Sequence, residues 1–121
     1  MMSPANLIES LVRFGRSLPV VVQGVSSADA KWKPADGAWS ILEIIMHLCD
    51  EEVDDFRTRV RMTLDDASRA WPEIHPSQWA IDRKYNEADL KQAVERFVRE
   101  RRSSVDWLRS LHDVDWSITH T

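Results

Sequence analysis

The stretch WSILEIIMHLCDEE, Trp39 to Glu52, opens with a helix start signal and places one histidine in an aliphatic run. Ser40 and Glu43 have the S-x-x-E spacing of a capping box: the serine oxygen accepts a first-turn amide, and the glutamate accepts the serine's own amide. The apolar residues that follow keep a helical period. The sequence therefore predicts a long helix from Ser40 to about Leu64, most apolar at its beginning.

Two more amphipathic helices are expected, and no segment shows the alternation of a strand. Ser3 and Pro4 are typical of a helix start, with an apolar stripe that stops near Pro19. Asn86, followed three residues later by Asp89, is a weaker start for a stripe that continues to position 111. The fold class is therefore all-α, a helical bundle with three long helices.

The connection over residues 65–86 is too long for a tight turn and contains two prolines. We expect it to be a crossover that packs on the bundle and allows the second and third long helices to run parallel. Arg101 falls inside the apolar stripe of the third helix. Such a charge either snorkels to solvent or finds a carboxylate partner, and we favour snorkelling.

Composition and charge set the class of molecule. With 121 residues, 43% of them hydrophobic and 30% charged, the chain fits a single domain over residues 1–121. Sixteen basic residues are interleaved with twenty acidic ones, which argues against nucleic acid as a partner. The apolar runs are too short for a membrane helix, no signal peptide is evident, and Cys49 is the only cysteine. We expect a cytoplasmic protein without a membrane partner.

His47 has two interpretations. On a helical wheel it shares a stripe with the acidic residues Glu43, Asp50, Glu51 and Asp54, which favours a surface histidine on a solvated acidic face. Alternatively, His47 and a carboxylate one turn later, Asp50 or Glu51, form a nitrogen and oxygen donor pair suited to Zn, Ni, Mn or Fe.

No complete site can be derived from spacing alone. The chain has no H-E-x-x-H motif, and its other histidines, His75, His112 and His120, stand apart from one another. Cys49 lies two positions from His47, on a different side of the helix, and is interpreted as a small buried hydrophobe. No catalytic residue can be assigned, and no motif for an organic cofactor is present.

Six tryptophans are many for this length. Four of them fall in connections or at helix starts: Trp32, Trp39, Trp71 and Trp79. Such residues usually cover a core, and the alternative is an aromatic-lined ligand pocket at one end of the bundle.

Three segments together resemble the DinB/YfiT-like superfamily. They are KWKPADGAWSILEIIMHLCDEE followed by FRTRVRMTL, then RAWPEIHPSQWAIDRKYNEADL, and the third helix through LHDVDWSITHT. The first is the most specific, because in this family a tryptophan-serine helix start precedes a histidine eight residues after the tryptophan. The matching positions are Trp39, Ser40, Glu43, His47, Leu48 and Glu52.

The resemblance implies a four-helix bundle of up-down-down-up topology, in which three histidines hold a divalent metal. His47 matches the first ligand, whereas the family's H-x-x-x-H pair on a fourth helix has no match, since His112 and His120 are eight apart. We therefore expect a chain that is incomplete at its C-terminus or a bundle completed by a partner, most simply as a homodimer. A single ligand predicts weak metal affinity for this chain alone.

The function implied by this resemblance is a bacterial metal-dependent enzyme. It would be a hydrolase or a transferase that uses a low-molecular-weight thiol, acting on a small-molecule substrate. The alternative is a metal-free helical interaction module that completes its bundle by oligomerisation.

Overall fold

The computed structural model describes residues 3–120, which form helices joined by loops, with no strand among them. The predicted all-α class is confirmed. The first long helix is α1, Pro4–Val21, and the last is α6, Leu90–Ser110. Between them, α3 (Ile41–Asp50), the π-helix η1 (Glu51–Arg57) and α4 (Thr58–Asp65) form one continuous rod. Shorter elements are α2 (Ser27–Lys31), α5 (Pro76–Asp82) and the 3-10 turn η2 (Tyr85–Glu87).

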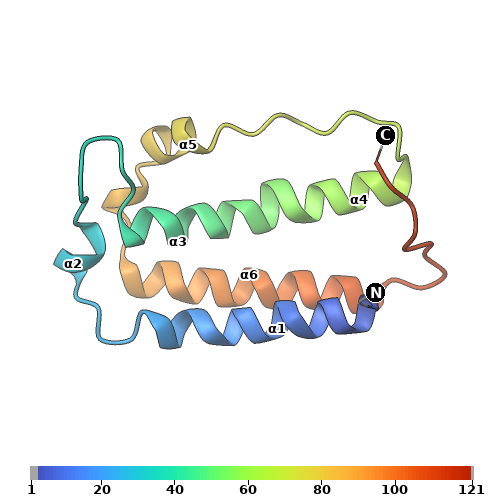
Figure 1. The fold of residues 1–121 in the computed structure, drawn as a ribbon, viewed down its shortest axis with the longest axis horizontal. Helices are drawn as coiled ribbons and strands as arrows, with labels where there is room; N and C mark the ends of the chain where they lie inside the picture. Colours follow the sequence, from blue (N-terminus) through green and yellow to red (C-terminus); the bar gives the residue numbers. More distant parts are fainter. Residues whose placement is uncertain (1–2, 121) are drawn as a thin grey trace.

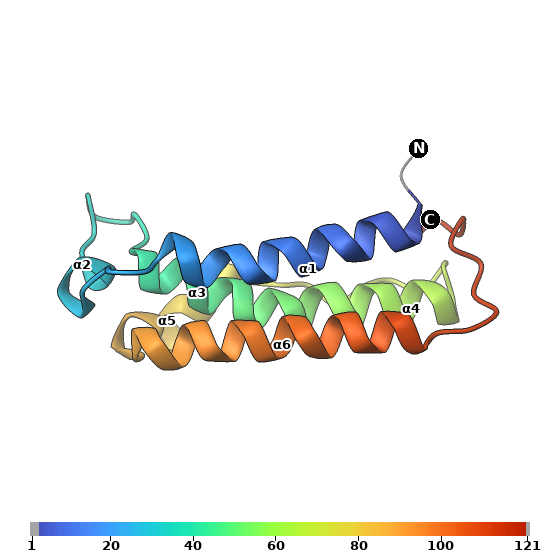
Figure 2. The same cartoon turned by 90° about the horizontal axis from the view of Figure 1, so that it is seen from below.

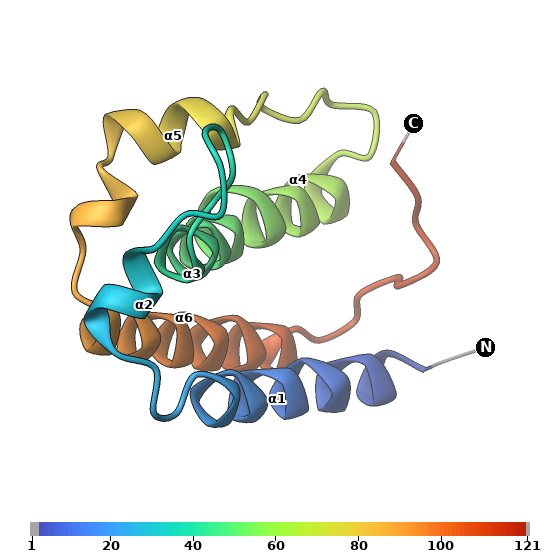
Figure 3. The same cartoon turned by 60° about the vertical axis from the view of Figure 1, so that its left-hand side comes forward.

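The three long rods, α1, α3–η1–α4 and α6, lie side by side with their axes in a common direction (Figures 1 and 2). In Figure 1, α1 runs in one direction, and the α3–η1–α4 rod and α6 both run in the other. The connection that contains α5 returns along the length of the bundle, so the predicted crossover and the parallel helices are confirmed. Helix α6 packs against both α1 and α3, as the view in Figure 3 also shows.

Caps fix where the helices begin. Ser3 Oγ accepts the amide of Asn6 at 3.2 Å, and both bonds of the capping box between Ser40 and Glu43 are present, as predicted. The third start was misplaced, because Asp89, not Asn86, caps α6 by accepting the amide of Gln92. Helix α1 also continues through Pro19 to Val21, so the proline does not end the helix where the sequence indicated.

The core lies where α1, α3 and α6 meet. Its fully buried side chains include Leu42, Ile45, Cys49 and Phe97. Cys49 is therefore the buried small hydrophobe that the sequence indicated. Burial is the main reason why the pKa of its thiol rises to about 11.

The rod was predicted as one regular helix, but its middle is π-helical. Two side chains here bond carbonyls five residues earlier: Arg57 Nε donates to Glu52 O at 3.2 Å, and Thr58 Oγ1 donates to Val53 O at 3.1 Å. A wheel with 100° per residue fails from Glu51 onward, because a π-turn is wider than an α-turn.

Arg101 does not snorkel, so the favoured prediction was wrong. Its side chain is only 11% exposed, and its guanidinium contacts Glu52 Oε1 at 2.7 Å and Leu11 O at 2.9 Å. Ser104 Oγ donates to the other Glu52 oxygen at 2.8 Å. The arginine passes close to Gly15, where a β-carbon would lie 2.9 Å from Arg101 Cγ. This buried cluster joins α1, η1 and α6.

Asp50 forms a second buried polar cluster. It accepts a short hydrogen bond from the hydroxyl of Tyr85, and its oxygens contact Arg83 Nη1 at 2.8 Å and Arg96 Nη2 at 2.9 Å. Burial alone would raise the pKa of Asp50, but these three partners outweigh it, and the pKa lies below its ordinary value. The cluster ties α3 to η2 and α6.

The prediction of a solvated acidic face is therefore wrong for two of its residues. Glu43 and Asp50 are buried, and Glu43 is held by the capping box and by Lys33 Nζ at 3.0 Å. The wheel could not show this, because Lys33 and the partners of Asp50 come from other segments. Within residues 3–120, no helix is long and apolar enough to cross a bilayer.

Candidate functional site

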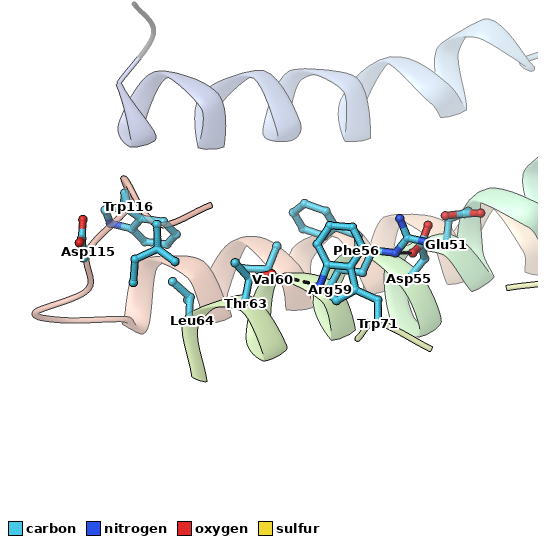
Figure 4. A pocket seen from close by; sticks show the side chains of 11 residues that line it. Glu51, Asp55, Phe56, Arg59, Val60, Thr63, Leu64, Trp71, Asp115 and Trp116 are labelled. Atoms are coloured by element: carbon cyan, nitrogen blue, oxygen red, sulfur yellow. Dashed lines mark hydrogen bonds and ion pairs between the residues drawn. The ribbon is translucent and has the colours of Figure 1, made fainter. Parts of the chain in front are cut away.

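A groove runs along the side of the rod and is named here the α4 groove (Figure 4). Its volume is about 500 Å³. Its walls combine side chains of η1 and α4 with others from the crossover and from the segment after α6: Glu51, Asp55, Phe56, Arg59, Val60, Thr63, Leu64, Trp71, Asp115, Trp116 and Ile118. Most of this lining is apolar, and the acids Glu51 and Asp55 lie together at one end.

His47 lies one turn before that acidic end. Its Nε2 is 3.4 Å from Glu51 Oε1, and the indole of Trp39 meets its ring edge-on at 5.0 Å between centroids. Its Nδ1 is buried and has no hydrogen-bond partner among the described residues. Burial lowers the pKa of His47 and outweighs the opposing pull of Asp50 and Asp55. The imidazole is therefore neutral at neutral pH, the form in which histidine binds a metal.

Glu51 has a strongly perturbed carboxyl group. Burial, a hydrogen bond with Asp55 and the negative charge of Asp55 raise its pKa to about 7. A carboxyl group poised near neutral pH inside a groove is typical of a functional site, because it binds a proton or another cation readily.

Asp55 continues the polar row along the groove. Its carboxylate forms an ion pair with Arg59, whose guanidinium carbon lies 4.7 Å from the centre of the Trp71 ring. Trp71 Nε1 in turn donates to Thr63 Oγ1 at 3.1 Å. The polar side chains from His47 to Arg59 thus end at the aromatic ring of Trp71.

The tryptophans divide between the two interpretations. Trp71 and Trp116 line the groove, as a pocket would require, and Trp39 covers His47. Trp32 is 66% exposed, and Trp79 lies beneath the guanidinium of Arg83 at 4.2 Å. An aromatic-lined groove is present along α4, and a ligand for it remains a prediction.

The donors at His47 fit part of a metal site. Two ligands of one tetrahedral zinc ion, each about 2.1 Å from the metal, lie roughly 3.4 Å apart. This matches the 3.4 Å between His47 Nε2 and Glu51 Oε1. Within residues 3–120, however, no group of three or more His, Cys, Asp or Glu side chains is placed to hold a metal. The described residues therefore supply a donor pair and not a complete site.

The other histidines lie apart from this pair. His75 is exposed and lies 3.6 Å from Glu73, and His112 is also exposed. His120 stacks on Trp71 at 3.8 Å, with its Nε2 2.9 Å from Arg69 O. Among the described residues, neither His112 nor His120 belongs to a group that could hold a metal with His47.

Sequence reasoning did not single out Asp55. Its signal is the spacing of four residues from His47 through Glu51 and Asp55 to Arg59, which places successive side chains on one stripe of a helix. Glu52, which the resemblance grouped with His47, points elsewhere and belongs to the buried Arg101 cluster.

These features define a class of protein: an all-helical bundle whose second long rod carries a histidine and a carboxylate beside an open groove. The sequence profile of the DinB superfamily matches residues 10–121, and the chain belongs to this superfamily. No curated protein matches the chain.

The fold is also similar to that of YfiT from Bacillus subtilis, with a TM-score of 0.78 and 18% sequence identity. YfiT is described as a probable metal-dependent hydrolase with an unusual four-helix bundle topology. The similarity covers 93% of this chain and 66% of YfiT, so the chain spans slightly less than two thirds of that protein. At this level of identity the likeness shows the shared fold.

Proposed function

We propose that this DinB-superfamily chain acts in divalent-metal-dependent catalysis and that His47 and Glu51 are two of the metal ligands. The observation that carries the proposal is the 3.4 Å separation of their donor atoms, which suits two ligands of one ion. The neutral imidazole supports it, and the Trp39 indole packs edge-on against the same ring.

The description of YfiT as a probable metal-dependent hydrolase supports hydrolysis as the reaction class. Thiol-dependent group transfer is the alternative that the resemblance to the superfamily implies. A bound divalent ion supplies Lewis acidity to such a reaction. The α4 groove would receive the small-molecule substrate: Phe56, Val60 and Trp71 would bind its apolar part. The remaining metal ligands must come from outside the set that residues 3–120 bring together, because this set contains only the pair.

Metal analysis with a matched histidine control tests this proposal. Purified natural chain, His47→Ala and His75→Ala are each loaded with Zn²⁺, desalted and measured by elemental mass spectrometry. His75 is the control because its side chain is 63% exposed and has no carboxylate nearer than Glu73 at 3.6 Å. We expect His75→Ala to bind like the natural chain, and His47→Ala to lose binding at least about tenfold. Equal metal in all three proteins, or none in any, would refute the proposal.

A metal-free interaction module is the second candidate. Its support is apolar surface: Leu7 is 52% and Phe14 45% exposed on α1, and Trp116 and Ile118 are 42% and 40% exposed beside the α4 groove. Such surface favours association, for which a homodimer is the simplest form. A dimer that persists in a chelator and binds no metal would support this module over the enzyme.

A further inference from the structure

A second groove lies between α1 and α6, and it shares no lining residue with the α4 groove. Its volume is about 490 Å³, and it is lined by Pro19, Val94, Glu95, Val98, Arg99 and Arg102. The proline and the two valines are half-buried, so they leave apolar surface open to solvent between charged side chains. This groove, named here the α1–α6 groove, contains neither His47 nor its acidic neighbours.

The α6 wall of this groove belongs to a stripe of charged residues around one valine, named here the α6 stripe. Its members follow one another at helical spacings of three or four residues, and they are Lys91, Glu95, Val98, Arg102 and Asp106. All four charged members are exposed. The ion pairs of α6 use other side chains, those of Arg96, Glu100, Arg101 and Arg109. Within residues 3–120, the four charges of the stripe thus have no ion-pair partner.

We propose that the α6 stripe joins two copies of the chain, whose α6 helices run antiparallel about a two-fold axis near Val98. Lys91 lies seven residues before Val98 and Asp106 eight after it. Glu95 lies three before Val98, and Arg102 lies four after it. An antiparallel pairing therefore sets Lys91 of one copy opposite Asp106 of the other, and Glu95 opposite Arg102. The two-fold axis repeats each of these contacts.

The order of the charges selects both the partner and its direction. Matching positions on the two sides of Val98 carry opposite signs, so the stripe is complementary to its own reversed copy. A parallel pairing would instead place Lys91 against Lys91 and Glu95 against Glu95, and like charges at short range oppose association. A second copy in the antiparallel direction is therefore the occupant that this surface fits.

The apolar and the charged parts of this surface have different roles. Helix α6 has 21 residues and is about 30 Å long, which allows contact over several turns. Val94 and Val98 would pack across the axis, and their removal from water would supply most of the affinity. Exposed ion pairs add little affinity, but they set direction and register. Arg99, also on the groove, adds to the positive charge that Glu95 of the other copy meets.

Sedimentation velocity in the presence of a chelator tests the interface by charge reversal. The natural chain should dimerise at concentrations up to roughly 100 µM. Glu95→Arg sets arginines opposite each other in both symmetric contacts, and Arg102→Glu sets glutamates opposite each other. Each variant alone should therefore weaken the dimer at least about tenfold. An equimolar mixture of the two variants restores opposite charges at both contacts and should dimerise like the natural chain.

A charge reversal elsewhere is the matched control. Glu73 lies on the crossover with its side chain 88% exposed, so Glu73→Arg should dimerise like the natural chain. A natural chain that stays monomeric over the same concentrations would overturn the interface. A dimer that survives in both single variants, or a mixture that fails to dimerise, would also overturn it. The interface requires neither His47 nor a bound metal, so it goes beyond the function proposed above and is tested separately from it.

Discussion

Asp50 and Glu51 are neighbours in sequence, yet their carboxyl groups behave in opposite ways. Asp50 accepts bonds from Tyr85, Arg83 and Arg96, and its pKa lies below the ordinary value despite burial. Glu51 faces the α4 groove, where burial and Asp55 raise its pKa to about 7. The difference comes from the partners: desolvation penalises the charge of both groups, and Asp50 has two hydrogen-bonded arginines and a hydroxyl that outweigh it, whereas the charge of Arg59 near Glu51 is outweighed by burial and Asp55.

The comparison separates groups that hold the fold from groups that are available for binding. Asp50, like Glu52 with Arg101 and Ser104, has its hydrogen-bonding capacity used by the protein. Glu51 and His47 keep free capacity, since among the described residues Nδ1 of His47 has no partner, and the side-chain hydrogen bond that raises the pKa of Glu51 is with another acid, Asp55. Unsatisfied polar groups beside a groove are candidates for a functional site, whereas satisfied buried ones are candidates for stability.

The largest effect is expected at Glu52, the residue after Glu51, when its ion-pair partner Arg101 is removed. Arg101→Met leaves the Glu52 carboxylate buried with only Ser104, so the free energy of unfolding should fall by about 3–4 kcal/mol. Urea denaturation measures this. Arg109→Met is the control, because Arg109 and Glu9 are 52% and 54% exposed, and it should change stability by less than about 0.5 kcal/mol. Equal effects of the two variants would contradict a structural role for the Arg101 cluster.

A smaller effect should distinguish Asp50 from Glu51 directly. Asp50→Asn removes the charge that Arg83 and Arg96 share, and it should cost about 2–3 kcal/mol, because both arginines retain some contact with solvent. Glu51→Gln removes a charge that burial and Asp55 disfavour more than Arg59 favours it, and it should be neutral or stabilising at pH 8. Urea denaturation of both variants in the presence of chelator makes the comparison. If Glu51→Gln proved the more costly variant, our assignment of the two roles would be reversed.

The pH dependence of stability should carry the signature of Glu51. Its pKa rises from an ordinary 4.5 to about 7, so the folded state holds a proton that the unfolded state has lost. The stabilisation is complete below pH 4.5 and is lost as the pH rises through 7. The lowered pKa of His47 acts in the opposite sense, adding stability as the pH rises.

The two contributions can be separated by difference. Melting temperatures of the metal-free natural chain and of Glu51→Gln are measured from pH 5 to about pH 8, in steps of roughly half a unit. The natural chain should lose stability relative to the variant as the pH rises, because only the natural chain contains the titrating carboxyl group. Parallel curves for the two proteins would mean that Glu51 titrates normally.

The smallest effect concerns Cys49, which immediately precedes the acidic run. Its thiol is buried and its pKa is raised to about 11, so little thiolate is present at pH 8. A thiol reagent should modify the folded chain at least about a hundredfold more slowly than the urea-unfolded chain. Comparable rates would show that the start of the rod opens readily.

Several features of this protein followed from local sequence. Ser3 and Ser40 fixed helix starts through their own hydrogen bonds, and the apolar period fixed the three long helices. The length of the crossover indicated that the second and third rods run parallel. The spacing between His47 and Glu51 also suggested a donor pair, because residues four apart in a helix are neighbours.

The tertiary structure decided which polar groups are satisfied. Asp50, Glu52 and Arg101 find partners 33 to 90 residues away in sequence, which no helical wheel can supply. The π-helical turn from Glu51 to Arg57 likewise altered the register of the groove. Local hydrogen bonds and periodicity depend on neighbours along the chain, so the sequence determines them. Burial, pKa and the opening of the α4 groove depend on the segments that come to lie opposite each residue, and only folding brings those segments together.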